Sequence, residues 1–341
     1  MDHIQLICVM QREAKESQLD QIRSELTDDR IPFSLTQQGD RRLIVIDAAD
    51  TETQDRLRSA PGIDRVIPGP APFRFVGRRY QAEDTVVKVG GVPIGDGGFV
   101  VTAGPCAVES REQVLETARL VKAAGATILR GDAYKPRTSP YAFQGLGAEA
   151  LEYLSEAREL TGLPFVAETV DPRDVESVSG SADMIRIGTR NMSNYALLKE
   201  VGMQSKPVLL KRGRTATIEE WLDAAEYIWD QGNHGIVLAE RGIRTFEPAT
   251  RNTLDISAVP IVKELSHLPV MVDPSHSAGR RDLVAPLARA SIAVGADGVL
   301  IDVHPDPDSA LVDGDQAILP SEFDDLMKDL GRLAAAMGVD V

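Results

Sequence analysis

Charged and metal-binding side chains follow eight short apolar segments of the chain, at the point where each segment ends. The segments run in series between Phe99 and Val303, and the residues at their ends are Cys106, Arg130, Glu168, Arg190, Lys211, Arg241, His276 and Asp302. In a parallel barrel of strands and helices, the carboxyl ends of all strands meet on one face, where the active site lies. The spacing therefore predicts one site that contains a thiol, carboxylates, imidazoles and several cations.

One group of these residues carries the donor atoms of a metal site. Closure makes the last strand a neighbour of the first, so we expect Cys106, His276 and Asp302 in one sector, with Asp313 from the following loop. A thiolate disfavours magnesium and calcium and favours manganese, iron, cobalt or zinc. A lone buried Cys is usually a packing residue, but the joint placement of these residues favours a metal site. His304 is a weaker candidate, for a place beside the ligands.

The opposite sector of the predicted site is cationic. Five basic side chains follow four of the strands: Arg130, Lys135, Arg190, Lys211 and Arg241. Local acids such as Glu168 and Glu240 are too few to neutralise all five, so we expect a small, multiply anionic ligand, because guanidinium groups bind phosphate and carboxylate in bidentate fashion. A second anion site is expected in the segment KPRTSP, at Arg137, Thr138 and Ser139. Two anion pockets and a metal indicate two phosphorylated substrates or one bisphosphate.

Lys211 has a second interpretation. A lysine at the end of a barrel strand can act as a Schiff-base nucleophile if its pKa is lowered, and the adjacent Arg212 and other cations would lower it. Phosphate binding is the simpler role for this lysine, and a metal makes a Schiff base unnecessary.

Hydrophobic periodicity predicts the elements that position these residues. Residues 1–70 show the order β-α-β-β-α-β, which is typical of a ferredoxin-like domain. Residues 71–97 are expected to form a linker and a hairpin around Gly90-Gly91 that closes the bottom of the barrel. From residue 98 to 341, apolar strands alternate with amphipathic helices, which predicts a parallel (β/α)8 TIM barrel.

Composition excludes several classes of protein. A formal net charge of −15 argues against nucleic acid as a partner. The chain lacks an apolar run of about 18 residues, so no membrane-spanning helix is expected, and the N-terminus does not resemble a secretory signal. With only two cysteines, a disulfide framework is not expected. We therefore expect a cytoplasmic protein.

Several long motifs resemble 3-deoxy-D-arabino-heptulosonate 7-phosphate (DAHP) synthase, in its short-chain type I (beta) form with an N-terminal ferredoxin-like domain. They are GPCAVES, LRGDAYKPRTSPYAFQGLG, KPVLLKRG, ERGIRTFE, NTLDISAVP, DPSHSAGRRDLV and VHPDP. The resemblance implies a transferase that condenses phosphoenolpyruvate with erythrose 4-phosphate, the first step of the shikimate pathway. It also implies one divalent metal, a homotetramer, and feedback inhibition by an aromatic amino acid bound to the N-terminal domain.

The resemblance also implies roles for individual residues. Metal ligands match Cys106, His276 and Asp313, with Asp302 where the family usually has Glu. Phosphoenolpyruvate-binding residues match Arg130, Lys135, Gly188, Thr189, Arg190, Lys211 and Arg241. The sugar-phosphate site matches Arg137, Thr138 and Ser139. Lys135, Cys106 and His276 are the expected catalytic residues, and either Lys135 or a metal-bound water supplies a proton to the new alkoxide.

Some positions depart from the family pattern. Thr189 replaces the usual Ala, Asp132 stands where Gly is common, Arg186 where Gln is common, and Arg214 where a hydrophobic residue is common. Two alternatives remain open. A related synthase uses arabinose 5-phosphate, although the KPRTSP motif disfavours that substrate. The second alternative is a non-catalytic regulator that binds metal and phosphate, although the retention of every cation argues against it.

Overall fold

The computed structural model describes residues 4–68 and 73–341. The chain divides into two compact units, Met1–Ala82 and Glu83–Val341. Within the described ranges, no helix combines the length and the apolar character that a membrane span requires.

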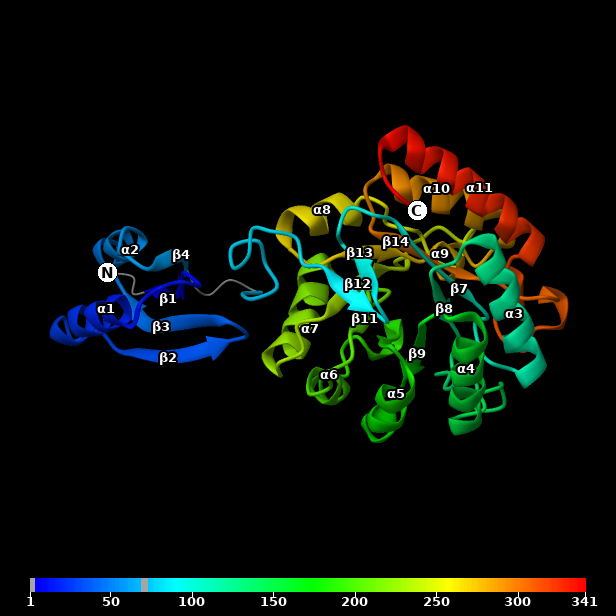
Figure 1. The fold of residues 1–341 in the computed structure, drawn as a ribbon, viewed down its shortest axis with the longest axis horizontal. Coiled ribbons are helices and arrows are strands. Elements are labelled where there is room, and N and C mark those ends of the chain that lie inside the picture. Colours follow the sequence, from blue (N-terminus) through cyan, green and yellow to red (C-terminus); the bar gives the residue numbers. More distant parts are fainter. Residues whose placement is uncertain (1–3, 69–72) are drawn as a thin grey trace. The chain divides into compact units, whose positions relative to one another are not determined.

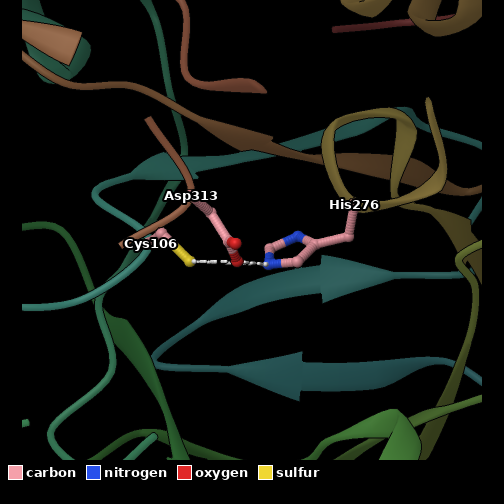
Figure 2. A group of neighbouring side chains, drawn as sticks. All are labelled: Cys106, His276 and Asp313. Carbon is pink, nitrogen blue, oxygen red and sulfur yellow. Dashed lines mark hydrogen bonds and ion pairs between the residues drawn. The ribbon is translucent and has the colours of Figure 1, made fainter. Parts of the chain in front are cut away.

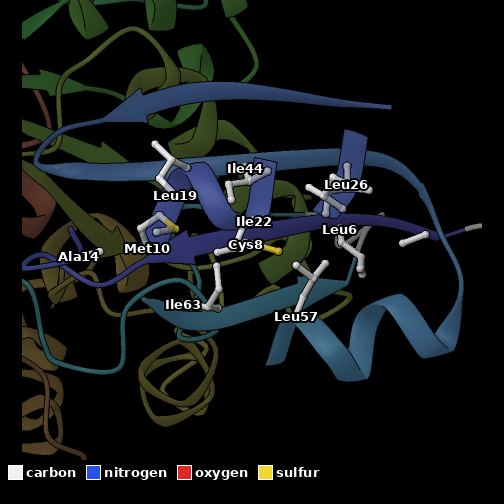
Figure 3. Packing of buried hydrophobic residues seen from close by; sticks show 12 residues of the cluster. Leu6, Cys8, Met10, Ala14, Leu19, Ile22, Leu26, Ile44, Leu57 and Ile63 are labelled. Atoms are coloured by element: carbon white, nitrogen blue, oxygen red, sulfur yellow. The ribbon is translucent and has the colours of Figure 1, made fainter. Parts of the chain in front are cut away.

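The first unit has the predicted β-α-β-β-α-β order. Its elements are β1 (Ile4–Met10), α1 (Glu16–Asp28), β2 (Phe33–Gln38), β3 (Arg41–Ala49), α2 (Thr51–Arg58) and β4 (Ile63–Pro68). The antiparallel sheet has the strand order β2-β3-β1-β4. On α1, the buried stripe of Leu19, Ile22 and Leu26 packs against sheet residues that include Cys8 and Ile44 (Figure 3). This unit therefore has a hydrophobic core of its own, and Cys8 belongs to it.

A hairpin opens the second unit. Strands β5 (Val87–Val89) and β6 (Val92–Ile94) pair in antiparallel fashion around Gly90 and Gly91. Val87, Val89 and Ile94 are buried in one cluster with residues from most of the barrel strands. The hairpin therefore covers apolar side chains inside the barrel.

The rest of the second unit is a closed parallel barrel of eight strands, as the alternation of strands and helices predicts. Around the barrel the order is β10-β11-β12-β13-β14-β7-β8-β9. The strands are β7 (Val100–Gly104), β8 (Ile128–Arg130), β9 (Phe165–Thr169), β10 (Met184–Ile187), β11 (Val208–Lys211), β12 (Ile236–Glu240), β13 (Val270–Val272) and β14 (Gly298–Asp302). Every residue of the barrel strands is buried, because helices cover the outside of the barrel (Figure 1) and apolar side chains pack inside it.

Helices follow the strands in turn. They are α3 (Arg111–Ala124), α4 (Ala148–Thr161), α5 (Val175–Ser181), α6 (Tyr195–Gly202), α7 (Ile218–Asp230), α8 (Ala258–Leu265), α9 (Pro274–Ala278), α10 (Arg281–Ala293) and α11 (Pro320–Met337). Short 3-10 turns are η1 (Pro172–Asp174), η2 (Thr189–Asn191), η3 (Pro307–Ser309) and η4 (Gly314–Gln316). Helix α3 shows the expected design, since Ser110 caps its start, Gly125 ends it in a left-handed conformation, and Val114 and Val121 are buried.

Closure joins the two ends of the barrel sequence. Strand β14 pairs with β7, and Asp302 lies opposite Gly104. The segments that follow β7, β13 and β14 therefore meet at one edge of the carboxyl face. Gly104 has a φ of 151°, and a Cβ atom there would lie 2.2 Å from the carbonyl oxygen of Arg130. Only glycine allows β7 to approach β8 this closely just before Cys106.

Candidate active site and metal centre

Three potential metal ligands converge at the carboxyl face of the barrel (Figure 2). Cys106 follows β7, His276 lies on α9 after β13, and Asp313 directly precedes η4 after β14. Cys106 Sγ lies 3.5 Å from both His276 Nε2 and Asp313 Oδ2, and these two atoms are 3.7 Å apart. The structure thus brings together three of the four ligands that the sequence predicts.

The backbone and the neighbouring residues hold this cluster in place. Asp313 has a φ of 53°, which is uncommon for a residue other than glycine. Such a backbone conformation indicates that the surrounding structure holds this residue in place. Its Oδ1 accepts a hydrogen bond from Arg251 at 3.1 Å, which leaves Oδ2 toward Cys106 and His276. His276 Nδ1 lies 3.0 Å from Asp273 Oδ2, and this partner orients Nε2 toward the cluster.

The donor set suits a divalent transition metal. Burial lowers the pKa of His276 and so favours the neutral imidazole that binds metals. Burial would raise the pKa of Asp313, but nearby positive charges, including those of Arg251 and Lys135, hold it well below its usual range. Burial raises the pKa of the Cys106 thiol, while the Lys135 ammonium 3.2 Å away opposes that rise. A thiol, an imidazole and a carboxylate with these surroundings fit a thiophilic divalent ion.

Asp302, the fourth predicted ligand, lies beside the cluster rather than in it. It is fully buried, and one carboxylate oxygen accepts a hydrogen bond from Arg130. The other oxygen accepts one from Gln316 Nε2 at 2.6 Å and lies 3.5 Å from His276 Nδ1. Both oxygens therefore have protein partners, and direct ligation by Asp302 stays a prediction. His304 faces Glu109 at 3.5 Å, outside the cluster.

The cationic residues differ in how they are neutralised. Three of the five have buried carboxylate partners: Arg130 pairs with Asp302 and Asp132, Lys135 with Asp132, and Lys211 with Asp273. Here the expectation that local acids are too few is only partly right, because Asp132 and Asp273 also lie within the site. Among the described residues, Arg190 and Arg241 have no carboxylate within ion-pair distance and remain available to an anionic ligand.

Burial changes the pKa of two of these cations. The pKa of Lys211 is lowered to about 8, because burial and the positive charges of Arg186 and Arg130 outweigh the attraction of Asp273. Burial also lowers the pKa of Arg241 to about 10. Lys135 behaves in the opposite way, since Asp132 raises its pKa and keeps its ammonium charged.

A cavity of about 290 Å³ joins the metal cluster to the cations. Its lining contains most of the predicted site residues, namely Lys135, Arg137, Thr138, Ser139, Gly188, Thr189, Arg190, Lys211, Arg241, His276 and Asp313. Arg190 Nη2 donates to Thr138 Oγ1 at 3.5 Å, so the two predicted anion sites touch. Cys106, Arg130 and Asp302 do not line the cavity; Cys106 and Asp302 contact His276, which does, and Arg130 contacts both Cys106 and Asp302.

Several residues of the site were not predicted as functional from the sequence. Arg186 and Arg251 line the cavity, as does Glu168, which was expected there only as a local acid, and Asp132 pairs with the lining residues Lys135 and Arg186. The sequence could have identified two of these residues, because Glu168 and Arg186 are charged residues within largely apolar strands of a buried barrel.

Known proteins with the same architecture identify the family. The model of the DAHP synthetase I family matches residues 80–336. The phospho-2-dehydro-3-deoxyheptonate aldolase of Thermotoga maritima is 52% identical over 303 residues, which cover 89% of this chain and 87% of that protein. The 2-dehydro-3-deoxyphosphooctonate aldolase of Bradyrhizobium diazoefficiens is 33% identical over 266 residues, 72% of this chain and 93% of that protein.

Solved structures agree with these matches. The crystal structure of the Thermotoga maritima DAHP synthase superimposes with a TM-score of 0.79 at 47% identity, and covers 99% of this chain and 100% of that one. A truncated form of the Thermotoga enzyme gives a TM-score of 0.75 at 51% identity, and covers 80% of this chain and 100% of that one. The fold, the site and these similarities together show that the chain belongs to the DAHP synthetase I family.

Proposed function

We propose that this protein condenses phosphoenolpyruvate with erythrose 4-phosphate and water, giving 3-deoxy-D-arabino-heptulosonate 7-phosphate and phosphate, the first step of the shikimate pathway. The observation that carries the proposal is the single cavity lined by metal-binding residues, by the cations Arg190, Lys211 and Arg241, and by the Arg137–Thr138–Ser139 segment. Membership of the family and 52% identity to the Thermotoga enzyme support the same activity.

The cations of the site account for the binding of phosphoenolpyruvate. Among the described residues Arg190 and Arg241 have no carboxylate partner, and Lys211, which pairs with the buried Asp273, lines the same cavity. Two guanidinium groups and an ammonium can hold a phosphate and a carboxylate in bidentate fashion and fix C3 toward the second substrate. The same charges offset negative charge as it develops on the departing phosphate.

The second substrate is assigned to the other end of the cavity. Arg137, Thr138 and Ser139 bind its phosphate, and its aldehyde then points toward Cys106, His276 and Asp313, which would hold a divalent ion of manganese, iron, cobalt or zinc. The chemistry that such an ion supplies when bound is Lewis-acid polarisation of the aldehyde oxygen. Lys135 is held protonated by Asp132 and lines the cavity, so its ammonium can donate a proton to the new alkoxide.

The bonds of the reaction balance as follows. C3 of phosphoenolpyruvate forms a bond to the aldehyde carbon, whose oxygen takes up a proton. Water adds at C2, and the bond between C2 and the bridging oxygen breaks, so that oxygen leaves with the phosphate. Phosphoenolpyruvate labelled with ¹⁸O at the bridging position should therefore release labelled phosphate. Label retained in the sugar acid would contradict this route.

Arabinose 5-phosphate is the competing second substrate, because 2-dehydro-3-deoxyphosphooctonate aldolases are also similar to this chain. Their identity is 33%, against 52% for the Thermotoga heptonate aldolase. The KPRTSP segment lines the cavity here, as the assignment of erythrose 4-phosphate requires. The ratio of initial rates with the two aldose phosphates decides between them.

We also propose a regulatory role for the N-terminal domain. It has a separate core, and none of the described residues of Met1–Ala82 lines the cavity. A domain with no part in the chemistry is free to bind an aromatic amino acid that inhibits the enzyme. A homotetramer is the assembly we expect, and light scattering of the purified protein measures it.

A further inference from the structure

Arg186 is a buried cation of the site that the assignments above leave without a role. It lies on β10, its exposure is only 2%, and it lines the same cavity as Arg190, Lys211 and Arg241. Charged residues are almost never this deeply buried unless their hydrogen-bonding groups are satisfied. The partners of Arg186 therefore indicate what it does.

One end of the Arg186 guanidinium is held by two carboxylates. Its Nη2 donates to Asp132 Oδ2 and, at 2.6 Å, to Glu168 Oε2. Asp132 is itself buried and accepts hydrogen bonds from Lys135 at 2.7 Å and from Arg130 at 3.3 Å. Asp132 thus bridges three cations and, together with Glu168, fixes the orientation of Arg186.

The other end of the guanidinium has no protein partner. Nε and Nη1 of Arg186 are buried, and neither makes a hydrogen bond within the described part of the chain. Nearly all buried polar groups in proteins have a partner, so these N–H groups indicate a ligand that supplies the acceptor. A guanidinium with free N–H groups matches an oxyanion such as a carboxylate or phosphate.

Two neighbours of Arg186 indicate which substrate supplies that oxyanion. Arg186 lies near enough to Lys211 for its charge to contribute to the lowered pKa of that lysine. Lys211 belongs to the cations assigned to phosphoenolpyruvate, whereas the hydrogen bonds and ion pairs of Arg186 in the described structure do not include Arg137, Thr138 or Ser139.

Arg212 shows what a purely structural buried arginine looks like in this barrel. It is as deeply buried as the site cations, with 5% exposure, but it does not line the cavity. Its Nε donates to the Ala216 carbonyl, and its Nη1 donates to Glu240 and Asp255 at 2.9 Å each. None of its nitrogen atoms is left buried without a partner in the described structure, in contrast to Arg186.

We propose that Arg186 binds an oxyanion of phosphoenolpyruvate through Nε and Nη1, and that Asp132 is the positioning residue that holds it for this contact. This inference rests on the proposed function, since phosphoenolpyruvate is its ligand. Neither Arg186 nor Asp132 belongs to the residues assigned to substrates above. Because the two residues carry opposite charges, the pair adds a cation to the site without changing its net charge.

Calorimetric titration of the full-length protein with phosphoenolpyruvate tests the role of Arg186. The Arg186→Gln variant should bind at least about 10-fold more weakly, since a charge-assisted contact is lost. Arg186→Lys keeps the charge but loses the planar fork, and should bind about 3-fold or more weakly. Arg212→Gln is the matched control, which should lower the melting temperature and leave this affinity within about twofold of the wild type.

The outcomes separate the inference from the proposed function. Wild-type protein that binds no phosphoenolpyruvate would contradict the proposed function itself. Wild-type binding together with unchanged affinity in Arg186→Lys, or in a folded Arg186→Gln variant, would show that Arg186 only braces the barrel. The lysine variant keeps the buried charge balance, so it supplies the test if the glutamine variant does not fold.

A double-mutant comparison tests the positioning role of Asp132. Asp132→Asn should weaken phosphoenolpyruvate binding in the wild-type background, because Arg186 loses its anchor. The same change should have a clearly smaller effect in the Arg186→Gln background, since the two residues act as one unit. An equal effect in both backgrounds would mean that Asp132 acts only through Lys135, and would overturn the positioning role.

Discussion

The two cysteines of the chain are both buried but lie in contrasting surroundings. Cys8 packs among apolar residues of the N-terminal domain, whereas Cys106 contacts His276, Asp313 and Lys135. We predict that Cys106→Ala loses bound metal and more than about 100-fold of the turnover, because a protein ligand is removed from the ion. Cys8→Ala is the control and should retain both.

Metal analysis and circular dichroism check this prediction. The barrel of Cys106→Ala should remain folded, because only a small side chain is removed at the edge of the core. Normal metal content and turnover in Cys106→Ala would show that Cys106 is only a packing residue.

Lys211 gives the site a pH dependence. Its pKa of about 8 in the free protein means that the ammonium is charged below pH 8 and becomes neutral above it. Phosphoenolpyruvate binds to the charged form, so its Kd should be steady below about pH 7 and rise as the pH passes 8. Lys211→Arg stays charged throughout this range and should remove the rise. Titrations at intervals of about half a pH unit between about pH 6.5 and 9.5 measure this dependence. A flat wild-type profile would contradict a binding role for Lys211 that depends on its lowered pKa.

Most residues that line the site could be predicted from the sequence, but their ion-pair partners could not. Strand ends identified Cys106 and His276, because the carboxyl face of a barrel collects them whatever the detailed packing. The partners of Arg186 could not be predicted, because Asp132 and Arg186 are 54 positions apart and meet only because β8, β9 and β10 lie side by side in the barrel. The resemblance implies that both positions differ from the residues usual in the family, and in the structure these two residues contact each other.

At the scale of elements, the hairpin of β5 and β6 depends on a close approach to the barrel. Gly90 has a φ of 53°, and a Cβ atom there would lie 2.4 Å from Cβ of Pro164. Gly162 is the matched control, with a φ of 71° and no atom within 4 Å of the added Cβ. Gly162→Ala should cost roughly 1–2 kcal/mol in unfolding free energy through its left-handed backbone alone.

Gly90→Ala should cost more, since overpacking adds roughly 1–3 kcal/mol to a similar backbone cost. Urea unfolding of the two variants compares them. Equal losses would mean that the hairpin moves away from the barrel without cost.

Hydrophobic periodicity determined these elements well because both domains are built from regular layers. The stripe of Leu19, Ile22 and Leu26 predicted α1, and the eight apolar segments predicted the barrel strands. The short 3-10 turns could not be predicted in this way. The 3-10 turn η4 and the left-handed backbone of Asp313 have no hydrophobic period, although they place a metal ligand.

In the whole molecule, the residues proposed to carry the reaction and the domain proposed to regulate it belong to different compact units. The domain boundaries predicted from the sequence fell at residues 70 and 98, and the compact units meet at Ala82 and Glu83. We predict that a chain beginning at Glu83 condenses both substrates at a rate within about threefold of the full chain, since no site residue is removed. Inhibition by tyrosine or phenylalanine should be lost.

Initial rates with and without each amino acid test this prediction on both chains. A full-length enzyme that ignores aromatic amino acids and later products of the pathway would contradict the regulatory role. Inhibition that persists in the shortened chain would move the inhibitor site to the barrel.

The most direct measurement is the initial rate of phosphoenolpyruvate loss with erythrose 4-phosphate or arabinose 5-phosphate, before and after chelation and after addition of manganese, iron, cobalt or zinc. The cavity that joins His276 and Asp313 of the metal cluster to the cations predicts rapid loss with erythrose 4-phosphate and much slower loss with arabinose 5-phosphate. Chelation should abolish the activity, and at least one of the four ions should restore it. Equal or reversed rates with the two sugars, or full activity after thorough chelation, would contradict the account.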